Sequence, residues 1–293
     1  MWPLVEVAVE PKSPADAEKL RFALSKLSAE DPTLSFHTDA ETGQTIIQGA
    51  SEAQLDAHVE RVRGSYAVRA DVGRVQVAYR ETICRKTETK YTHRKHFGPS
   101  WQYAEVTIVF EPIDRYAGVV FENKAIVGSV PREYVPAIER GVRLQAQTGA
   151  IAGFPTVDFK FTLTDGRYHD VDSSPLAFEI AARACFRQLG KTGSVKILEP
   201  VMKVEVVTPG EHVHKIMCDL KKRSCGLAAV EPHGDAKIVT ALAPLGAMLG
   251  YPATLGALSD GKARLSMQYE THQEVMRPEP PDDRFPPAMA MRA

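Results

Sequence analysis

The chain has 293 residues, of which 44% are hydrophobic and 25% are charged. These values exclude a chain that is disordered throughout, and the length exceeds that of one typical domain. Its 36 lysines and arginines nearly balance 37 aspartates and glutamates, so the formal net charge is -1. A protein that binds nucleic acid over its whole surface would be strongly basic, so any RNA contact must come from local patches.

The N-terminal part, residues 1–76, predicts a ferredoxin-like βαββαβ order. Ser13 can cap a helix that Pro14 opens and that Asp31 and Pro32 stop. A second helix carries the apolar stripe of residues 55–62. The expected strands are residues 4–9, 34–38, 44–48 and 66–72, with residues 39–43 as the turn of a hairpin.

The same order recurs in residues 199–273, which we predict to form a second ferredoxin-like domain. The expected strands are residues 201–207, 237–243 and 263–269. The expected helices are residues 210–223 and 245–258, the second of them interrupted by Pro252. Gly226 is predicted to end the first of these helices in a left-handed conformation. Residues 274–293 are rich in proline and are expected to be a disordered tail.

The middle part, residues 77–198, is predicted to be an α+β domain. A long strand runs into a basic arm, followed by strands at 101–110, 156–164 and 195–198 and a helix at 134–148. The cations of the arm are Arg85, Lys86, Lys90, Arg94 and Lys95, and they surround His93 and His96. Such a crowd of cations disfavours a metal and favours phosphate, although a solvated arm without a partner is the alternative.

The most informative stretch is residues 166–178, which predicts a strand end, a tight polar loop and a helix. Ser174 fits the N-cap and Pro175 the first helical position. The residues expected to be buried by this helix are Leu176, Ala177, Ile180, Ala181, Ala184 and Cys185. His169, Asp170 and Asp172 then project from the loop without an apolar role.

Three hypotheses fit His169, Asp170 and Asp172. A histidine beside two carboxylates can bind a metal or transfer protons, but neighbouring loop residues point in alternating directions and need not converge. An ordinary polar turn is the second hypothesis. Contact with the riboses, phosphates and bases of RNA is the third, and we favour it.

Three further candidate sites give weaker indications of binding or catalysis. Residues 190–192 imitate the end of a phosphate-binding loop, but Cys185 stands where its first glycine is required and the segment closes a helix. Cys218 and Cys225 are interpreted as inert thiols rather than a metal pair. Lys221, Lys222 and Arg223 either complement a negative helix end or contact RNA.

Five segments, in order, resemble signatures of the elongation factor G family of translational GTPases. They are VAVEPK at 7–12, VAYRETI at 77–83, PREYVPA at 131–137, GRYHDVDSSPLAF at 166–178 and LEPVMKVE at 198–205. The resemblance implies domains III, IV and V of that family. The implied fold is α+β, with two ferredoxin-like domains flanking a ribosomal protein S5 domain 2-like domain.

The resemblance also implies function. It suggests a monomeric, ribosome-binding half of a translocation factor that contacts ribosomal RNA, tRNA and mRNA. Its tip loops would be residues 98–102 (Gly98, Pro99, Ser100, Trp101 and Gln102) and the loop with His169, Asp170, Asp172 and Ser174. Lys221, Lys222 and Arg223 would face large-subunit RNA. GTP and Mg²⁺ would belong to N-terminal domains that this chain lacks, so we expect no enzyme activity, cofactor or metal here, and either a shortened chain or a natural half-length protein.

One segment departs from the family pattern. Where the family has a glycine-rich loop, this chain has Pro99, which stiffens the backbone, and Trp101, which adds a stacking surface. This departure leaves open a paralogue specialised for ribosome recycling or ribosome protection. A small-molecule enzyme that uses His169 as acid or base is the alternative from another class.

Overall fold

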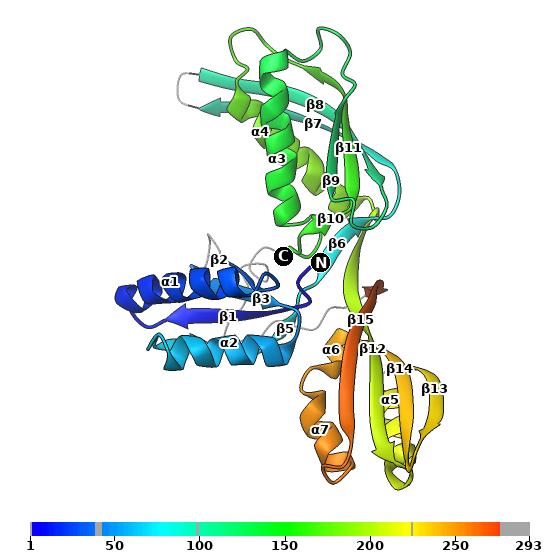
Figure 1. Ribbon diagram of the computed structural model, residues 1–293. Helices are drawn as coiled ribbons and strands as arrows, with labels where there is room; N and C mark the ends of the chain where they lie inside the picture. The colour runs from blue at the N-terminus through cyan, green and yellow to red at the C-terminus, as the bar shows by residue number, and fades with distance from the viewer. Residues whose placement is uncertain (1, 39–42, 98–99, 224, 276–293) are drawn as a thin grey trace. The chain divides into compact units, whose positions relative to one another are not determined.

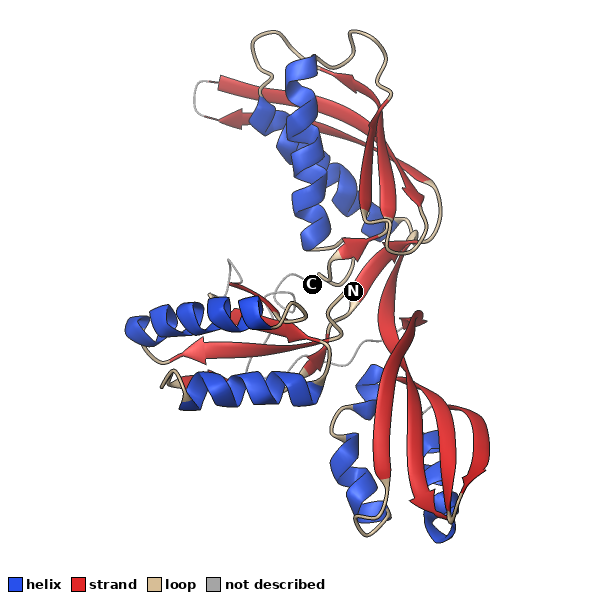
Figure 2. Cartoon of the chain, viewed as in Figure 1, coloured by secondary structure: helices blue, strands red, loops and turns tan. Residues whose placement is uncertain are grey.

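The computed structural model describes residues 2–38, 43–97, 100–223 and 225–275 (Figure 1). The chain divides into two compact units. Tyr79–Leu198 form one of them, called the middle unit here, and the segments before and after it are grouped in the other. In each segment the helices lie against sheets (Figure 2), and the predicted α+β class is confirmed. In the described part of the chain, no helix is long and apolar enough to cross a membrane.

The first segment forms an antiparallel sheet of order β2-β3-β1-β4, with β5 also paired to β1. Its elements are β1 (Val5–Pro11), α1 (Pro14–Glu30), β2 (Ser35–Thr38), β3 (Thr45–Gly49), α2 (Glu52–Gly64), β4 (Ala70–Val72) and β5 (Gln76–Val77). Ser13 and Ser51 cap the two helices through their side-chain oxygens. The predicted strand 66–72 is too long, because Ala67 has a φ of 49° and interrupts the extended backbone. Most of the predicted turn, residues 39–42, lies outside the described residues.

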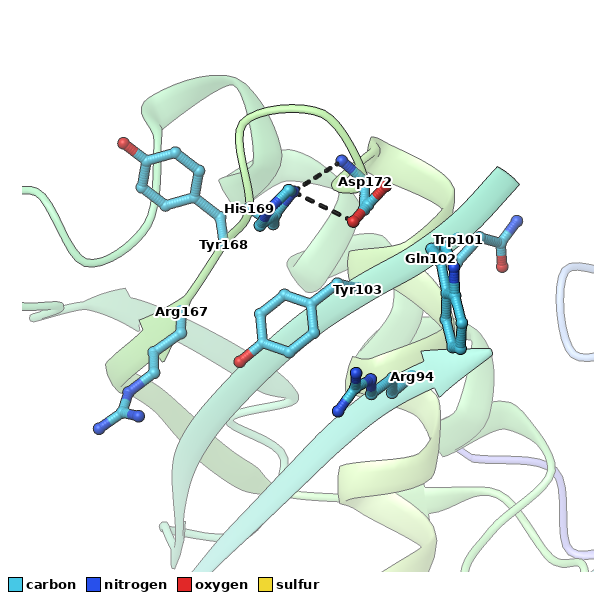
Figure 3. Close-up of a pocket in the computed structure, with 8 residues that line it drawn as sticks. All are labelled: Arg94, Trp101, Gln102, Tyr103, Arg167, Tyr168, His169 and Asp172. Carbon is cyan, nitrogen blue, oxygen red and sulfur yellow. Dashed lines mark hydrogen bonds and ion pairs between the residues drawn. The ribbon is translucent and has the colours of Figure 1, made fainter. Parts of the chain in front are cut away.

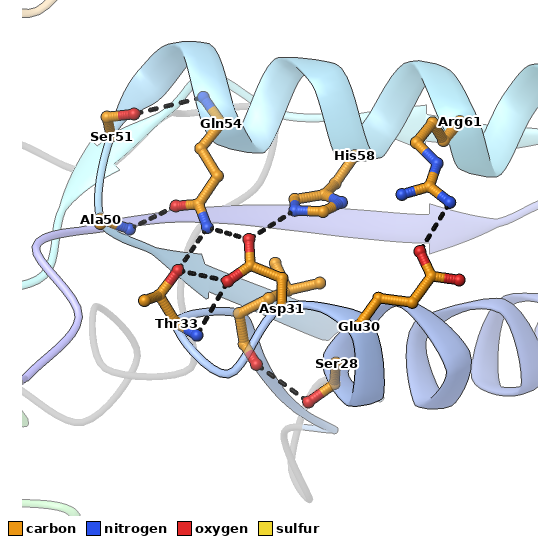
Figure 4. Close-up of polar contacts among 10 residues, drawn as sticks. Ser28, Glu30, Asp31, Thr33, Ala50, Ser51, Gln54, His58 and Arg61 are labelled. Carbon is orange, nitrogen blue, oxygen red and sulfur yellow. Dashed lines mark hydrogen bonds and ion pairs between the residues drawn. The ribbon is translucent and has the colours of Figure 1, made fainter.

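A polar network joins the end of α1 to α2 (Figure 4). Asp31 Oδ1 accepts hydrogen bonds from the Thr33 backbone N–H at 2.9 Å and from its hydroxyl at 2.6 Å. Asp31 Oδ2 accepts from Gln54 Nε2 at 2.6 Å and lies 3.2 Å from His58 Nε2. Hydrogen bonds from Thr33, Gln54 and His58 hold the pKa of Asp31 far below its ordinary value of 3.8.

Replacing Asp31 with Asn should therefore lower the thermal stability of the chain at pH 7. Since the folded-state pKa of Asp31 lies below the unfolded value of 3.8, its charge stabilises the fold above that pH, and the stabilisation is lost as the pH falls further. The difference between the two proteins in melting temperature should shrink as the pH falls below 3.8. Circular dichroism at several pH values measures this, with Asp56→Asn on the exposed side of α2 as the matched control. A difference that does not change with pH would contradict the charged network.

The middle unit contains a four-stranded sheet of order β7-β8-β11-β9, in which β11 is antiparallel to β8 and parallel to β9. Its elements are β6 (Arg80–Ile83), β7 (Thr87–Phe97), β8 (Ser100–Pro112), β9 (Val119–Asn123), η1 (Arg132–Tyr134), α3 (Val135–Gln147), β10 (Thr156–Val157), β11 (Phe159–Arg167), α4 (Pro175–Arg187) and η2 (Gln188–Lys191). The predicted strand 156–164 breaks at Asp158, where φ is 54°. The Asp158 carboxylate accepts the backbone N–H groups of Tyr116 and Gly118, and this contact holds the turn before the unpredicted strand β9.

Helices α3 and α4 cover one face of this sheet, and the stripe that α4 buries agrees only in part with the predicted one: Ala177, Ala181 and Cys185 are buried as predicted. The fully buried residues of α4 are Ala177, Phe178, Ala181, Ala182, Cys185 and Phe186. Leu176 is 56% exposed, and Ile180 and Ala184 are only half-buried. The face rotates because the two phenylalanines bury more area and find aromatic partners: Phe178 stacks on Tyr134, and Phe186 packs edge-on against Phe110.

Because Phe186 is buried and Leu176 is exposed, we expect opposite outcomes when each is truncated. Phe186→Ala should cost about 3–5 kcal/mol of unfolding free energy, whereas Leu176→Ala should change it by no more than about 0.5 kcal/mol. Urea unfolding followed by Trp101 fluorescence in a Trp2→Phe background reports on the middle unit. Equal losses for the two variants would show that the buried face of α4 is assigned wrongly.

A buried carboxylate organises the loop before β10. Glu81 is fully buried, and its oxygens accept the backbone N–H groups of Ala150 at 2.6 Å and Ala152 at 2.8 Å, with Ile151 between them. Burial raises the pKa of Glu81, and these hydrogen bonds oppose that shift. Gly149 has a φ of 68°, and a Cβ there would lie 2.5 Å from Glu81 Oε1, so only glycine fits.

The last segment forms strands in the order β13-β14-β12, with β15 paired to β12. Its elements are β12 (Val195–Pro209), η3 (Gly210–His212), α5 (Val213–Lys222), β13 (Gly226–His233), β14 (Ala236–Pro244), α6 (Leu245–Met248), α7 (Tyr251–Leu258) and β15 (Arg264–Val275). The order βαββαβ is therefore present, as predicted.

Three details of the last segment correct the prediction. The strands expected at 195–198 and 201–207 are one strand, β12. Gly226 does not cap a helix, because it opens the unpredicted strand β13 and pairs with Leu242. The helix expected at 245–258 is interrupted, as predicted, but at Gly250, where φ is 68°, and not at Pro252, which occupies the first turn of α7.

Candidate nucleic-acid interface

The loop between β11 and α4 is fastened to strand β8. Ser173 Oγ accepts the His169 backbone N–H at 2.9 Å and donates to the Tyr103 carbonyl oxygen at 2.7 Å. The Tyr103 N–H in turn donates to the Asp172 carbonyl oxygen at 3.0 Å. Ser174 caps α4 by accepting the Ala177 N–H at 3.2 Å, as the sequence predicted. The loop is thus held to β8 by the Ser173 hydroxyl and the Tyr103 backbone N–H, and to α4 by the Ser174 hydroxyl.

Within this loop, His169 and Asp172 converge, contrary to the expectation of alternating directions. His169 Nδ1 lies 3.1 Å from Asp172 Oδ2, because the loop turns tightly instead of continuing as a strand. The same nitrogen lies 3.3 Å from the Asp172 backbone N and 3.4 Å from that of Val171. A neutral Nδ1 can accept these N–H groups, and a protonated one can donate to the carboxylate. The His169 side chain is 58% exposed, and Asp170 is also exposed.

A pocket of about 430 Å³ opens between this loop and the β7–β8 hairpin (Figure 3). Its lining residues are Arg94, Trp101, Gln102, Tyr103, Arg167, Tyr168, His169 and Asp172. The structure therefore brings together five predicted residues: Arg94, Trp101, Gln102, His169 and Asp172. The sequence prediction missed Tyr103, Arg167 and Tyr168 as part of the site. The pairing register between strands reveals Tyr103 and Arg167, whereas Tyr168 follows β11 directly before His169.

The remaining predicted residues of the hairpin loop are placed only in part. Ser100 is the first residue of β8. Gly98 and Pro99 lie outside the described residues.

The basic arm runs from Arg85 and Lys86, just before β7, into that strand, and three of its five cations have acceptors within the domain. Lys86 pairs with Glu111 at 2.8 Å, and Lys90 pairs with Glu105 at 2.8 Å. Arg85 donates to the Thr192 carbonyl oxygen. The Arg94 guanidinium lies over the Trp101 ring, and Lys95 is exposed.

The two histidines of the arm do not form a metal pair. His93 is buried, with Nε2 3.1 Å from Gln102 Oε1, whereas His96 is exposed and packs against Trp101. Residues three apart on a strand point to opposite faces. In the ranges that the structure describes, no three His, Cys, Asp or Glu side chains are arranged to hold a metal ion.

Arg223 differs from its two neighbours at the end of α5. Its guanidinium donates to Asp219 Oδ2 at 2.9 Å and to the Ala247 carbonyl oxygen at 2.8 Å, and it lies 4.9 Å from the centre of the Tyr251 ring. Burial raises the pKa of Tyr251 to about 12. Lys221 and Lys222 are exposed. Arg223 therefore fastens α5 to the helices that follow. Lys221 and Lys222 supply the exposed positive charge at this end of α5.

The segment that imitates a phosphate-binding loop ends a helix. Gly190 and Lys191 belong to η2, and Thr192 is its C-cap, ahead of β12. A Cβ at position 190 would lie 2.3 Å from the Ala150 carbonyl oxygen, so Gly190 serves close packing.

Three family models match the chain in order. They are "Elongation Factor G, domain III" at residues 2–74, "Elongation factor G, domain IV" at 75–194 and "Elongation factor G C-terminus" at 196–282. Two curated relatives called elongation factor G are similar over 94% of this chain: the protein of Granulibacter bethesdensis is 50% identical and that of Gluconobacter oxydans 49%. A crystal structure of a protein from Thermus thermophilus, 34% identical, matches 94% of this chain and 41% of its own with a TM-score of 0.65.

The fold and these matches define a set of translation-factor domains. The chain belongs to the elongation factor G family, as the sequence resemblance predicted. It spans about 40% of the length of the curated relatives it matches.

Because Ser173 bridges the loop to β8 and His169 only projects from it, their substitutions should differ in effect. Ser173→Ala removes two hydrogen bonds and should cost about 1–3 kcal/mol, whereas His169→Ala should stay within about 0.5 kcal/mol. Urea unfolding measures both. If His169→Ala unfolds the domain, the residue has a structural role and not an interface role.

Proposed function

We propose that this chain is the ribosome-binding C-terminal half of a translational GTPase, and that its middle unit promotes tRNA–mRNA translocation near the decoding region. Its partners are ribosomal RNA, tRNA and mRNA, in the cytoplasm, and it acts as a monomer. GTP and Mg²⁺ belong to other domains of such a factor, and this chain supplies no hydrolysis. Membership in the family supports this proposal.

The observation that carries the proposal is the His169 loop. Hydrogen bonds from Ser173 and Tyr103 fix its backbone, yet the His169 side chain is 58% exposed. A loop that is rigid before binding loses little conformational entropy when it contacts RNA. Its imidazole, carboxylates and neighbouring Arg167 supply donors and acceptors for riboses, phosphates and base edges. The loop acts by binding and catalyses no reaction.

The geometry favours binding over the enzyme hypothesis. The hydroxyl of Ser173 is engaged by His169 N–H and Tyr103 O, and that of Ser174 by the helix cap. Neither is therefore available as a nucleophile for His169 to activate. His169 Nδ1 also faces back into its own loop, towards the Val171 and Asp172 backbone N–H groups and the Asp172 carboxylate.

The test is a chimera in which residues 2–275 replace the matching segment of the Granulibacter bethesdensis protein. His169→Ala in this chimera should slow single-turnover translocation by about tenfold or more, because an interaction of about 1.4 kcal/mol is lost, while GTP hydrolysis on the ribosome stays unchanged. Rapid kinetics with fluorescent mRNA follows translocation, and Arg187→Ala, exposed at the end of α4, is the control.

The other outcomes of this experiment are also informative. Unchanged translocation in the His169→Ala chimera would refute the role of the loop. A chimera that splits ribosomes but does not translocate would assign the chain to ribosome recycling, and one active only with a ribosome-bound antibiotic would assign it to protection.

A further inference from the structure

Helix α5 of the last segment has one covered face and one open face. Val213, Ile216 and Leu220 are buried, and they recur at the three- to four-residue spacing of a helix that is covered on one side. The helix packs against strands β13 and β14 (Figure 1). We call the exposed residues of α5 its basic face, and they are His214, Lys215, Cys218, Lys221 and Lys222.

Within the basic face, the side chains of Cys218 and His214 form a hydrogen bond. Cys218 Sγ lies 3.7 Å from His214 Nε2, an ordinary length for a bond to sulfur. Residues four apart lie one above the other on a helix, so α5 itself sets this geometry. Nε2 can accept the thiol proton and, once protonated, can donate back to the sulfur. The pair is therefore a nucleophile in contact with a base.

The other cysteines lack such a partner. Cys84 is exposed, but its thiol makes no hydrogen bond to a histidine within the ranges that the structure describes. Cys185 and Cys225 are buried, and burial raises the pKa of both thiols, that of Cys185 to about 11. Buried neutral thiols are inert. The sequence predicted inert thiols at Cys218 and Cys225, and the structure separates these two, because Cys218 is exposed and bonded to a base.

The charges of the basic face favour a negatively charged reagent. Its three lysines stand three or four residues from Cys218 in sequence, and this spacing places their side chains beside the thiol. The acid of α5, Asp219, is half-buried and accepts Arg223 Nε at 2.9 Å, so it is directed away from this task. Attraction between exposed opposite charges acts over about 10 Å at 0.1 M salt. Anions are therefore concentrated around Cys218.

We propose that Cys218 is a thiol–disulfide exchange site for small disulfides that carry carboxylates, with His214 as its base. His214 takes the thiol proton, and the sulfur of Cys218 attacks one sulfur of the disulfide. The S–S bond of the reagent breaks as the new S–S bond forms. Cys218 is thereby oxidised, and the other half of the reagent is reduced and leaves as a thiolate that receives the proton. A small thiol reverses the reaction by the same steps.

The mixed disulfide changes the charge of the basic face. Its carboxylates lie one helical turn from Lys221 and Lys222 and offset their positive charge. The exchange thus converts an exposed cationic surface into a neutral one, and a thiol restores it. This inference does not rest on the proposed function, because it concerns the chemistry of α5 alone.

The first experiment compares two variants that each keep one exposed thiol. Cys84→Ser keeps Cys218, and Cys218→Ser keeps Cys84. The probe is dithiobis(nitrobenzoate), an anionic disulfide whose leaving thiolate is coloured. A free thiol is only a few per cent thiolate at neutral pH, so Cys218 should react about tenfold faster than Cys84. In urea, which removes the helix, the two rates should converge. Equal rates in the folded chains would overturn the proposal.

The second experiment tests the base in the Cys84→Ser background. His214→Ala should slow the reaction of Cys218 about tenfold. His214→Gln should not restore the rate, because an amide keeps a hydrogen bond but cannot take the proton. The matched control is His37→Ala, an exposed histidine of the first segment, which should react like the background. An unchanged rate in His214→Ala, with an unchanged circular dichroism spectrum, or a rate that Gln restores, would refute His214 as the base.

The third experiment tests the preference for anions with a neutral probe, dithiodiethanol, whose adducts are followed by mass spectrometry. The ratio of the rate with the anionic probe to the rate with the neutral one should be larger for Cys218 than for Cys84. This ratio should fall as salt is added, and replacing Lys215, Lys221 and Lys222 with Gln should abolish the excess. Oxidised glutathione, which is anionic, should label Cys218 first. A ratio that responds to neither salt nor the lysines would overturn the selectivity.

Discussion

The backbone of Tyr103 holds the tip of the middle unit together. Its N–H donates to the Asp172 carbonyl and its carbonyl accepts from Ser173, so two polar groups of one residue fasten a loop that lies about 70 residues further along the chain. The same residue is paired with Arg94 in the β7–β8 hairpin. The positions of His169, Trp101 and the cations therefore depend on a single register. A slip of one residue would turn Trp101 towards α4 and leave the His169 loop without its anchor.

Short-range signals in the sequence predicted the local structure well. Ser13 and Ser174 cap their helices as expected, because a cap depends on residues three positions apart. Strand β9 was not predicted, since its pairing partner β11 is distant in sequence. Strand β13 was missed although it forms a hairpin with the next strand, β14. Periodicity placed Ala177, Ala181 and Cys185 of α4 correctly but missed Phe178 and Phe186. A count of apolar positions does not include the extra area that Phe178 and Phe186 bury.

In the candidate site, too, local features were predicted from the sequence and contacts between strands were not. The polarity of His169, Asp170 and Asp172 identified the loop, but Arg167 and Tyr103 join the site only through strand pairing. Runs of cations were the least informative feature. The sequence cannot show that Arg223 packs on Tyr251 while Lys222 faces solvent. Charge becomes a binding surface only where tertiary contacts leave it accessible.

The carboxylate of Glu81 has a consequence for dynamics. The backbone amides of residues 150–152 belong to a connecting loop, and loop amides normally exchange with solvent quickly. Here a buried anion accepts all three of them. Opening this loop means exposing Glu81 as well, so the segment behaves kinetically as part of the hydrophobic core. The middle unit thus has, in residues 150–152, a connecting loop that resists fraying.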